Sequence, residues 1–174
     1  MFDPRHRAEF LQEVKDVFFQ GMSQGWVTGG EKQRDVPFPG AKCYTFTRGR
    51  FTLKDFFFVN SLSNSSCGST VISWAGLSTG PVWMMQYGGW YKKEVMEFLK
   101  RVLARYYTSN VFYGGRGPIM FAGEDHMIQY LNNVIRNDFA DFLGHESIIV
   151  TSELYGCPPG TIQGEHHYFG RALV

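Results

Sequence analysis

The chain has 174 residues, of which 44% are hydrophobic and 19% are charged, a balance typical of one globular domain with a sizeable core. Its 17 basic and 16 acidic residues leave a formal net charge of +1, so no bulk field attracts nucleic acid or a membrane surface. Aromatic residues make up 17% of the chain, and so many rings require a core, a ligand pocket or a subunit interface to bury them. We therefore expect a single domain over residues 1–174, without nucleic acid or membrane among its partners.

The three cysteines, Cys43, Cys67 and Cys157, favour a reducing compartment. They are odd in number and widely spaced, and no Cys-x-x-Cys pair indicates a zinc site. The first residues contain no apolar signal core, and no stretch reaches the ~18 apolar residues that a membrane-spanning helix needs. No nucleotide-binding fingerprint is present. We expect a cytoplasmic protein without a cofactor.

Residues 1–60 predict a helix followed by two strands. Asp3 and Pro4 are typical of a helix start, because an aspartate cap is followed by proline in the first turn. Apolar residues then recur at three-to-four spacing, and Gly21 can end the helix. The following residues are rich in glycine, proline and charge and predict a loop. Strands are expected at 41–47 and 51–60.

The clearest strand signal lies between Cys67 and Tyr91. Residues 69–75 are rich in β-branched and aromatic side chains, and a turn leads into a second strand over residues 82–87. Alternate residues of that second strand share a face, and both faces are largely apolar. We therefore expect this hairpin inside a sheet rather than at its edge.

A second helix is predicted over residues 92–107, where an apolar stripe lies opposite a basic face. We interpret the basic face as solvated, because no aromatic-basic groove motif accompanies it. The glycine-rich stretch 113–118 carries Arg116. It lacks the Lys-Ser/Thr ending of a phosphate-binding P-loop, so a plain turn is the favoured interpretation.

The last third of the chain is partly ambiguous. Residues 123–142 are compatible with helix or strand, because their apolar spacing nearly fits a helix while their Asn and Asp residues also suit strand ends and a turn. Residues 147–154 and 161–173 predict strands, joined by a turn at Cys157.

The two halves of the chain echo each other. Gly68-x-Thr70-x-Ile72 is matched by Gly144-x-Glu146-x-Ile148, and each is followed by a proline-containing turn and a strand with Tyr-x-Gly. We predict pseudo-repeats at about residues 51–91 and 130–171. The expected fold class is α+β: a curved antiparallel sheet of two three-stranded meanders, with two or three helices packed on it.

Several motifs resemble a bacterial family of domains of unknown function, often attached to helix-turn-helix regulators. They are Pro81-Val82-Trp83-Met84-Met85-Gln86-Tyr87-Gly88-Gly89, then Arg116-Gly117-Pro118, then Phe142-Leu143-Gly144-His145-Glu146-Ser147-Ile148. The family's first Phe-x-Gly-x-Glu motif is replaced here by Cys67-Gly68-Ser69-Thr70. The resemblance covers roughly residues 50–170 and implies no established chemistry. It implies a domain that senses or processes a small molecule.

The densest cluster of reactive side chains is Glu165-His166-His167-Tyr168. On a strand, Glu165 and His167 share one face while His166 and Tyr168 share the other, so the two histidines cannot easily chelate one metal ion. We predict no metal site. Glu146 lies among apolar residues, where a carboxyl can act as general acid or base, bind a cationic ligand, or accept backbone hydrogen bonds.

Our leading hypothesis is a domain that binds a small organic molecule in an aromatic cleft between the two halves. The expected ligand-binding residues come from both halves of the chain: Trp74, Trp83, Met85, Tyr87 and Glu146.

Two other hypotheses stay open. The first is a cofactor-free enzyme, an isomerase, cyclase, lyase or hydrolase, with Glu146 or Glu165 as general base and His166 or Tyr168 as general acid. The second is a protein-interaction module whose aromatic residues form a subunit interface, giving a homodimer.

Overall fold

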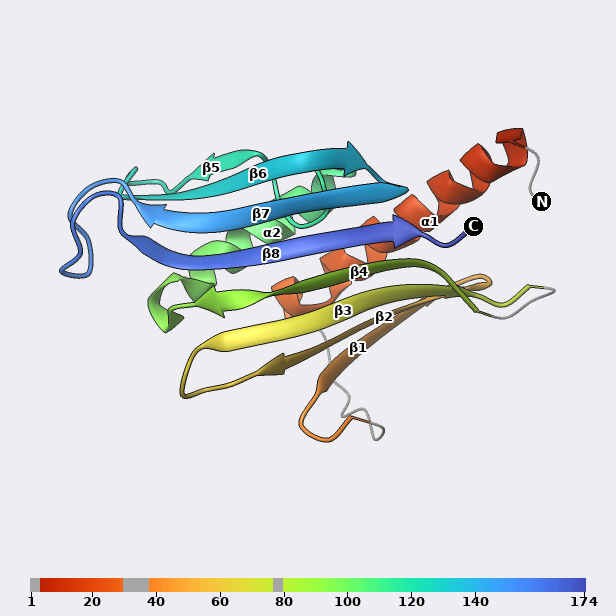
Figure 1. Ribbon diagram of the computed structural model, residues 1–174, viewed down its shortest axis with the longest axis horizontal. Helices are drawn as coiled ribbons and strands as arrows, with labels where there is room; N and C mark the ends of the chain where they lie inside the picture. The colour runs from red at the N-terminus through yellow and green to blue at the C-terminus, as the bar shows by residue number, and fades with distance from the viewer. Residues whose placement is uncertain (1–3, 30–37, 77–79) are drawn as a thin grey trace.

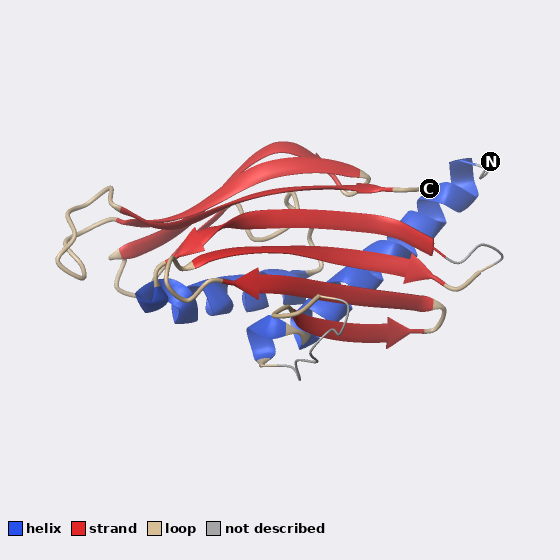
Figure 2. Cartoon of the chain, turned by 60° about the horizontal axis from the view of Figure 1, so that its bottom comes forward, coloured by secondary structure: helices blue, strands red, loops and turns tan. Residues whose placement is uncertain are grey.

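A computed structural model describes residues 4–29, 38–76 and 80–174. The chain forms one curved antiparallel sheet, and both long helices lie against the same face of it (Figures 1 and 2). The α+β class and the antiparallel sheet are confirmed. Within the described ranges, no helix is long and apolar enough to cross a membrane.

The helices and strands follow each other in the order helix, four strands, helix, four strands. They are α1 (Pro4–Gln24), β1 (Lys42–Arg48), β2 (Phe51–Val59), β3 (Ser65–Trp74), β4 (Gly80–Tyr91), α2 (Met96–Ser109), β5 (Met120–Ala122), β6 (Ile128–Asp138), β7 (Asp141–Val150) and β8 (Ile162–Ala172). Two short 3-10 turns are η1 (Trp26–Thr28) and η2 (Lys93–Val95). The spatial order of the strands is β1-β2-β3-β4-β8-β7-β6-β5.

The number of strands corrects the sequence-based prediction. Two three-stranded meanders make six strands, whereas the sheet has eight, in two meanders of four. The two strands outside the predicted meanders lie at the two edges: β1, whose strand at 41–47 was predicted and is confirmed, and β5, which was not predicted. β5 has three residues, too few for an alternating pattern to be recognised in the sequence.

The ambiguous residues 123–142 contain no helix: a turn leads into β6, and a second turn at 139–140 leads into β7. Ile128, Tyr130 and Asn132 are buried on one face of β6, which is the two-residue period of a strand. The turn into β7 is held by Asp138, whose Oδ1 accepts a hydrogen bond from the amide of Ala140 at 2.8 Å. Asn137 and Asp138 therefore mark a strand end, whereas Asn132 and Asn133 lie in the middle of the strand.

Helix α1 does not end at Gly21 but continues to Gln24. A Cβ atom at Gly21 would lie 2.9 Å from Cδ1 of Leu53 in β2, so this glycine allows the helix to pack closely on the sheet. The glycine is required by helix–sheet packing rather than by the helix end.

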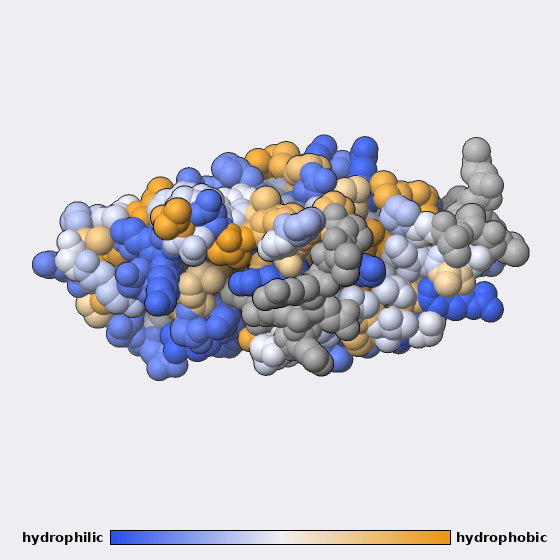
Figure 3. All heavy atoms as spheres, turned by 90° about the horizontal axis from the view of Figure 1, so that it is seen from below, coloured by the Kyte–Doolittle hydropathy of each residue, from blue (hydrophilic) through white to orange (hydrophobic). Residues whose placement is uncertain are grey.

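The hairpin of β3 and β4 lies inside the sheet, as its sequence predicts. β4 pairs with β3 on one side and with β8 on the other. Trp83 and Met85 of β4 are fully buried, and the Trp83 ring stacks on Phe139 and Phe142 with centroids 5.0 and 5.4 Å away. On the face seen in Figure 3, hydrophobic groups are interspersed among hydrophilic ones, in keeping with this internal placement of the large rings.

Two tyrosines cross neighbouring strands where those strands carry glycine. Tyr87 lies opposite Gly68, and Tyr168 lies opposite Gly144. A Cβ atom on either glycine would overlap the facing tyrosine ring or hydroxyl. The glycines therefore leave the space in which both rings lie over the adjacent strand.

We expect Gly144→Ala to destabilise the protein by about 1–3 kcal/mol, because the added methyl group has no room beside the buried Tyr168. Gly80→Ala is the control, since a Cβ atom there meets no atom of the described residues within 4 Å. Urea denaturation of both variants measures the difference in the free energy of unfolding. Equal stabilities would contradict the close approach of Tyr168.

Candidate functional site

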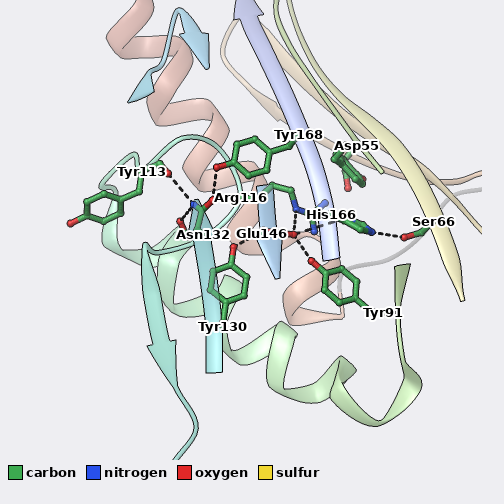
Figure 4. A network of polar contacts seen from close by, with 12 residues as sticks. Asp55, Ser66, Tyr91, Tyr113, Arg116, Tyr130, Asn132, Glu146, His166 and Tyr168 are labelled. Carbon is green, nitrogen blue, oxygen red and sulfur yellow. Dashed lines mark hydrogen bonds and ion pairs between the residues drawn. The ribbon is translucent and has the colours of Figure 1, made fainter. Parts of the chain in front are cut away.

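Buried polar side chains gather on the helix-facing side of the sheet, around the junction of β4 and β8 (Figure 4). Those that lie on strands occupy the alternate positions whose side chains point toward the core. Asn132 of β6 pairs with Glu146 of β7, and Glu146 pairs in turn with His166 of β8. Adjacent strands thus bring three polar residues, well separated in sequence, into one row.

Glu146 is the centre of this network and is fully buried. The Tyr91 hydroxyl donates a hydrogen bond of 2.5 Å to Oε1 of Glu146, and the Tyr130 hydroxyl donates one of 2.5 Å to Oε2. Nε of Arg116 lies 2.8 Å from Oε1 and forms an ion pair with it. Burial, and then the charge of Glu146, raise the pKa of both tyrosines well above the usual value, so both remain protonated donors.

Arg116 comes from the glycine-rich turn between α2 and β5. Gly114 and Gly115 there have φ values of +83° and +115°, a region that favours glycine. The guanidinium carbon lies 4.4 Å from the centroid of the Tyr87 ring, a cation–π contact. Its anion is a carboxylate of the chain itself. Burial lowers the pKa of Arg116, but Glu146 together with the surrounding tyrosines outweighs this and raises the pKa overall.

Asp55 and Asn132 each accept a hydrogen bond from one of the two crossing tyrosines. Tyr87 donates to Oδ1 of Asp55 at 2.9 Å, and Tyr168 donates to Oδ1 of Asn132 at 2.5 Å. Thr70 also donates to Oδ1 of Asp55, at 2.8 Å. Burial raises the pKa of Asp55, although its hydrogen bonds and the nearby arginine oppose that rise.

Asn132 also holds the turn that carries Arg116. Its Nδ2 donates to the carbonyl oxygens of Tyr113 and Gly117, at 3.1 and 3.0 Å. The arginine is therefore positioned by the same strand that provides Tyr130 to Glu146.

His166 lies between Ser66 of β3 and Glu146. Its Nε2 is 2.9 Å from Oγ of Ser66, and its Nδ1 is 4.0 Å from Oε1 of Glu146, beyond hydrogen-bond distance. Burial, followed by the positive charge of Arg116, lowers the pKa of His166 to about 2. Ser66, His166 and Glu146 are thus arranged in space like the serine, histidine and acid of a serine-hydrolase triad. This imidazole, however, is held neutral and is a weak proton acceptor.

A cavity of about 90 Å³ lies beside this network, between the sheet and the helices. Its walls are mainly apolar, formed by side chains that include Met22, Phe57, Met96, Leu99 and Leu103. Its polar wall consists of Asp55, Ser66, Arg116 and His166, and the rings of Tyr87 and Tyr91 also line it. A mostly apolar cavity with a few placed polar groups is typical of small-molecule sites.

The structure brings together four of the predicted site residues: Tyr87, Glu146, His166 and Tyr168. Tyr87 and His166 line the cavity, whereas Glu146 and Tyr168 lie in the network behind it.

The other predicted site residues lie elsewhere. Trp83 and Met85 are core residues, and Trp74 packs against Phe10 with ring centroids 5.5 Å apart. Glu165 lies on the opposite face of the sheet, where it contacts Trp90 and His145. None of these four predicted residues lines the cavity.

Six site residues were missed by sequence reasoning: Asp55, Ser66, Tyr91, Arg116, Tyr130 and Asn132. Asp55 stands at a buried-face position between Leu53 and Phe57, and a charged residue in such a position is a usable signal. Arg116 is surrounded by glycines in the sequence, which indicated a turn but not that its side chain is buried.

Comparison of the chain with protein-family models, with curated proteins and with solved structures finds no match.

We expect Glu146→Gln to cost about 3–5 kcal/mol of unfolding free energy, because it leaves the buried Arg116 without its anion. Asp141→Asn is the control, since it breaks the exposed Arg136–Asp141 pair and should cost less than about 1 kcal/mol. Chemical denaturation measures both. Similar losses in the two variants would contradict a dominant role for the buried pair.

Stability should also depend on pH through His166. In the unfolded chain this histidine binds a proton below about pH 6.5, whereas in the folded chain its pKa is about 2. The unfolded state therefore binds more protons between these values, and unfolding becomes easier as the pH falls, by at most about 1.4 kcal/mol per pH unit.

His166→Gln should flatten this pH dependence when unfolding is measured between pH 7.5 and 5. The control is His126→Asn, an exposed site whose φ of +56° asparagine tolerates. A slope that is unchanged in His166→Gln, or flattened equally by both variants, would show that His166 is not the titrating group.

Proposed function

We propose that this protein binds a small organic molecule in the cavity between the sheet and the helices. The observation that carries the proposal is a largely apolar cavity of about 90 Å³ with a buried guanidinium and a buried carboxyl in its wall. Apolar walls supply affinity, and a few buried polar groups supply orientation and selectivity. The cavity is smaller than an engineered cavity of about 150 Å³ that accepts benzene, which indicates a small ligand or a small inserted group.

We infer further that the two halves of the chain are pseudo-repeats and that the site lies near their junction. This is supported by matching contacts, since Tyr87 donates to Asp55 in one half and Tyr168 to Asn132 in the other. The two tyrosines also pair directly across β4 and β8. Membership of the bacterial family described above and a cytoplasmic location are parts of the same proposal.

An enzyme that uses this cavity is the second candidate. It is favoured by the hydrogen bond of 2.9 Å between Ser66 and His166 in the cavity wall, which aligns a hydroxyl with an imidazole. The low pKa of His166 is unfavourable to general-base catalysis. Hydrolysis of p-nitrophenyl acetate that Ser66→Ala abolishes would establish this candidate in place of simple binding.

An interaction module is the third candidate. The aromatic residues expected at its interface include Trp83, which is fully buried within the chain. A homodimer therefore has less support here than a ligand, and sedimentation of the full chain tests it.

Native mass spectrometry beside the denatured mass tests the leading proposal. We expect the purified protein to carry a small molecule that is lost on denaturation. Val59 lines the cavity and is 51% exposed, so Val59→Trp should block the cavity entrance and abolish the extra mass.

Ile162→Trp is the matched control, because Ile162 is a strand residue that is 43% exposed and does not line the cavity. It should retain the bound mass. If both variants retain the extra mass, the molecule is bound elsewhere. If the unmodified protein and both variants carry no extra mass, the result counts against a tightly held ligand.

A further inference from the structure

Two side chains in the cavity wall have hydrogen-bonding capacity that the protein does not use. Arg116 is 7% exposed and pairs with Glu146 most closely through Nε, while no residue of the described ranges accepts a hydrogen bond from its two Nη groups. Asp55 is 4% exposed and receives both of its hydrogen bonds at Oδ1, so Oδ2 receives none from the described residues. Both residues line the cavity, so these unused donors and this unused acceptor can bind a molecule from outside the chain.

A single rigid ring connects the two groups. The Tyr87 hydroxyl donates to Asp55 at 2.9 Å, and the Arg116 guanidinium lies over the same ring, 4.4 Å from its centroid. The Nη donors of Arg116 and the Oδ2 acceptor of Asp55 are thus held at fixed positions around Tyr87, within one small cavity. One molecule of a few heavy atoms can contact both.

The charges in the wall restrict the class of that molecule. Arg116 and Glu146 neutralise each other, His166 is neutral, and the buried tyrosines are protonated, so Asp55 is the carboxyl without a cation of its own. An anionic ligand would be attracted by Arg116 but would lie beside the Asp55 carboxyl. A cationic ligand would be attracted by Asp55 but would lie against Arg116. An uncharged ligand can hydrogen-bond to both groups without bringing a charge into the desolvated site.

On the premise that the cavity binds a small molecule, we propose that its ligand is uncharged and presents a carboxamide-like edge, whose carbonyl accepts hydrogen bonds from Arg116 and whose N–H donates to Asp55. Primary amides, lactams and ureas share this arrangement of one acceptor beside one donor. A site built to hydrogen-bond such a group discriminates strongly against analogues that leave its polar atoms unpaired.

Three probes of similar size separate the possibilities: isobutyramide, isobutyrate and isobutylamine. Each is titrated at pH 7 into the full ¹⁵N-labelled chain, and amide shifts near Asp55 and Arg116 report occupancy of the cavity. We expect isobutyramide to bind at least about 10-fold more tightly than either charged probe, the ratio expected when one hydrogen bond to a charged group is lost.

Asp55→Asn provides a sharper test, because it replaces the acidic group by a neutral amide while Oδ1 can still accept from Thr70 and Tyr87. Isobutyrate should then gain affinity, and isobutyramide should lose about 10-fold. Asp141→Asn is the matched control, since this exposed residue lies outside the cavity and its substitution should change neither affinity.

The outcomes separate this inference from the proposal on which it rests. Equal affinities, or a preference for a charged probe in the unmodified protein, overturn the carboxamide class and leave small-molecule binding standing. If no probe shifts the cavity residues while native spectra show a bound mass that Val59→Trp loses, the class is again wrong. If no probe binds and no mass is carried, water alone fills the cavity and both proposals fall.

Discussion

The buried ion pair between Arg116 and Glu146 constrains the rest of the structure. Neither charge is tolerated alone in a desolvated interior, so the turn that carries Arg116 and the strand that carries Glu146 must come together. Glu146 needs further donors, which Tyr91 of β4 and Tyr130 of β6 supply. One carboxylate thus ties the centre of the sheet to a strand near its edge and to the connection between the helix and the sheet.

The two crossing tyrosines extend this polar centre in both directions. Tyr87 and Tyr168 face each other across the β4–β8 junction, and each passes over a glycine of its outer neighbour. Their hydroxyls hold Asp55 in one half and Asn132 in the other. Asn132 then holds the turn of Arg116, so the glycines serve the site as well as the packing of the sheet.

Strand alternation made part of the site predictable. It placed His166 and Tyr168 on one face and Glu165 on the other, and the structure has the first two buried and the third on the open side of the sheet. The same reasoning could not tell a pocket wall from a core position on one face. Trp83 shares a face with Tyr87, yet Trp83 is covered by Phe139 and Phe142, while Tyr87 borders the cavity.

The sequence by itself determined the α+β class and the central position of the 67–91 hairpin, because these follow from local periodicity and turn chemistry. Only the tertiary structure decided that residues 128–138 form a strand, since neighbouring strands supply the hydrogen bonds that an ambiguous pattern needs. It also decided the surroundings of Asp55 and Arg116. Their burial depends on partners from distant parts of the chain, and no local pattern records which charges will meet.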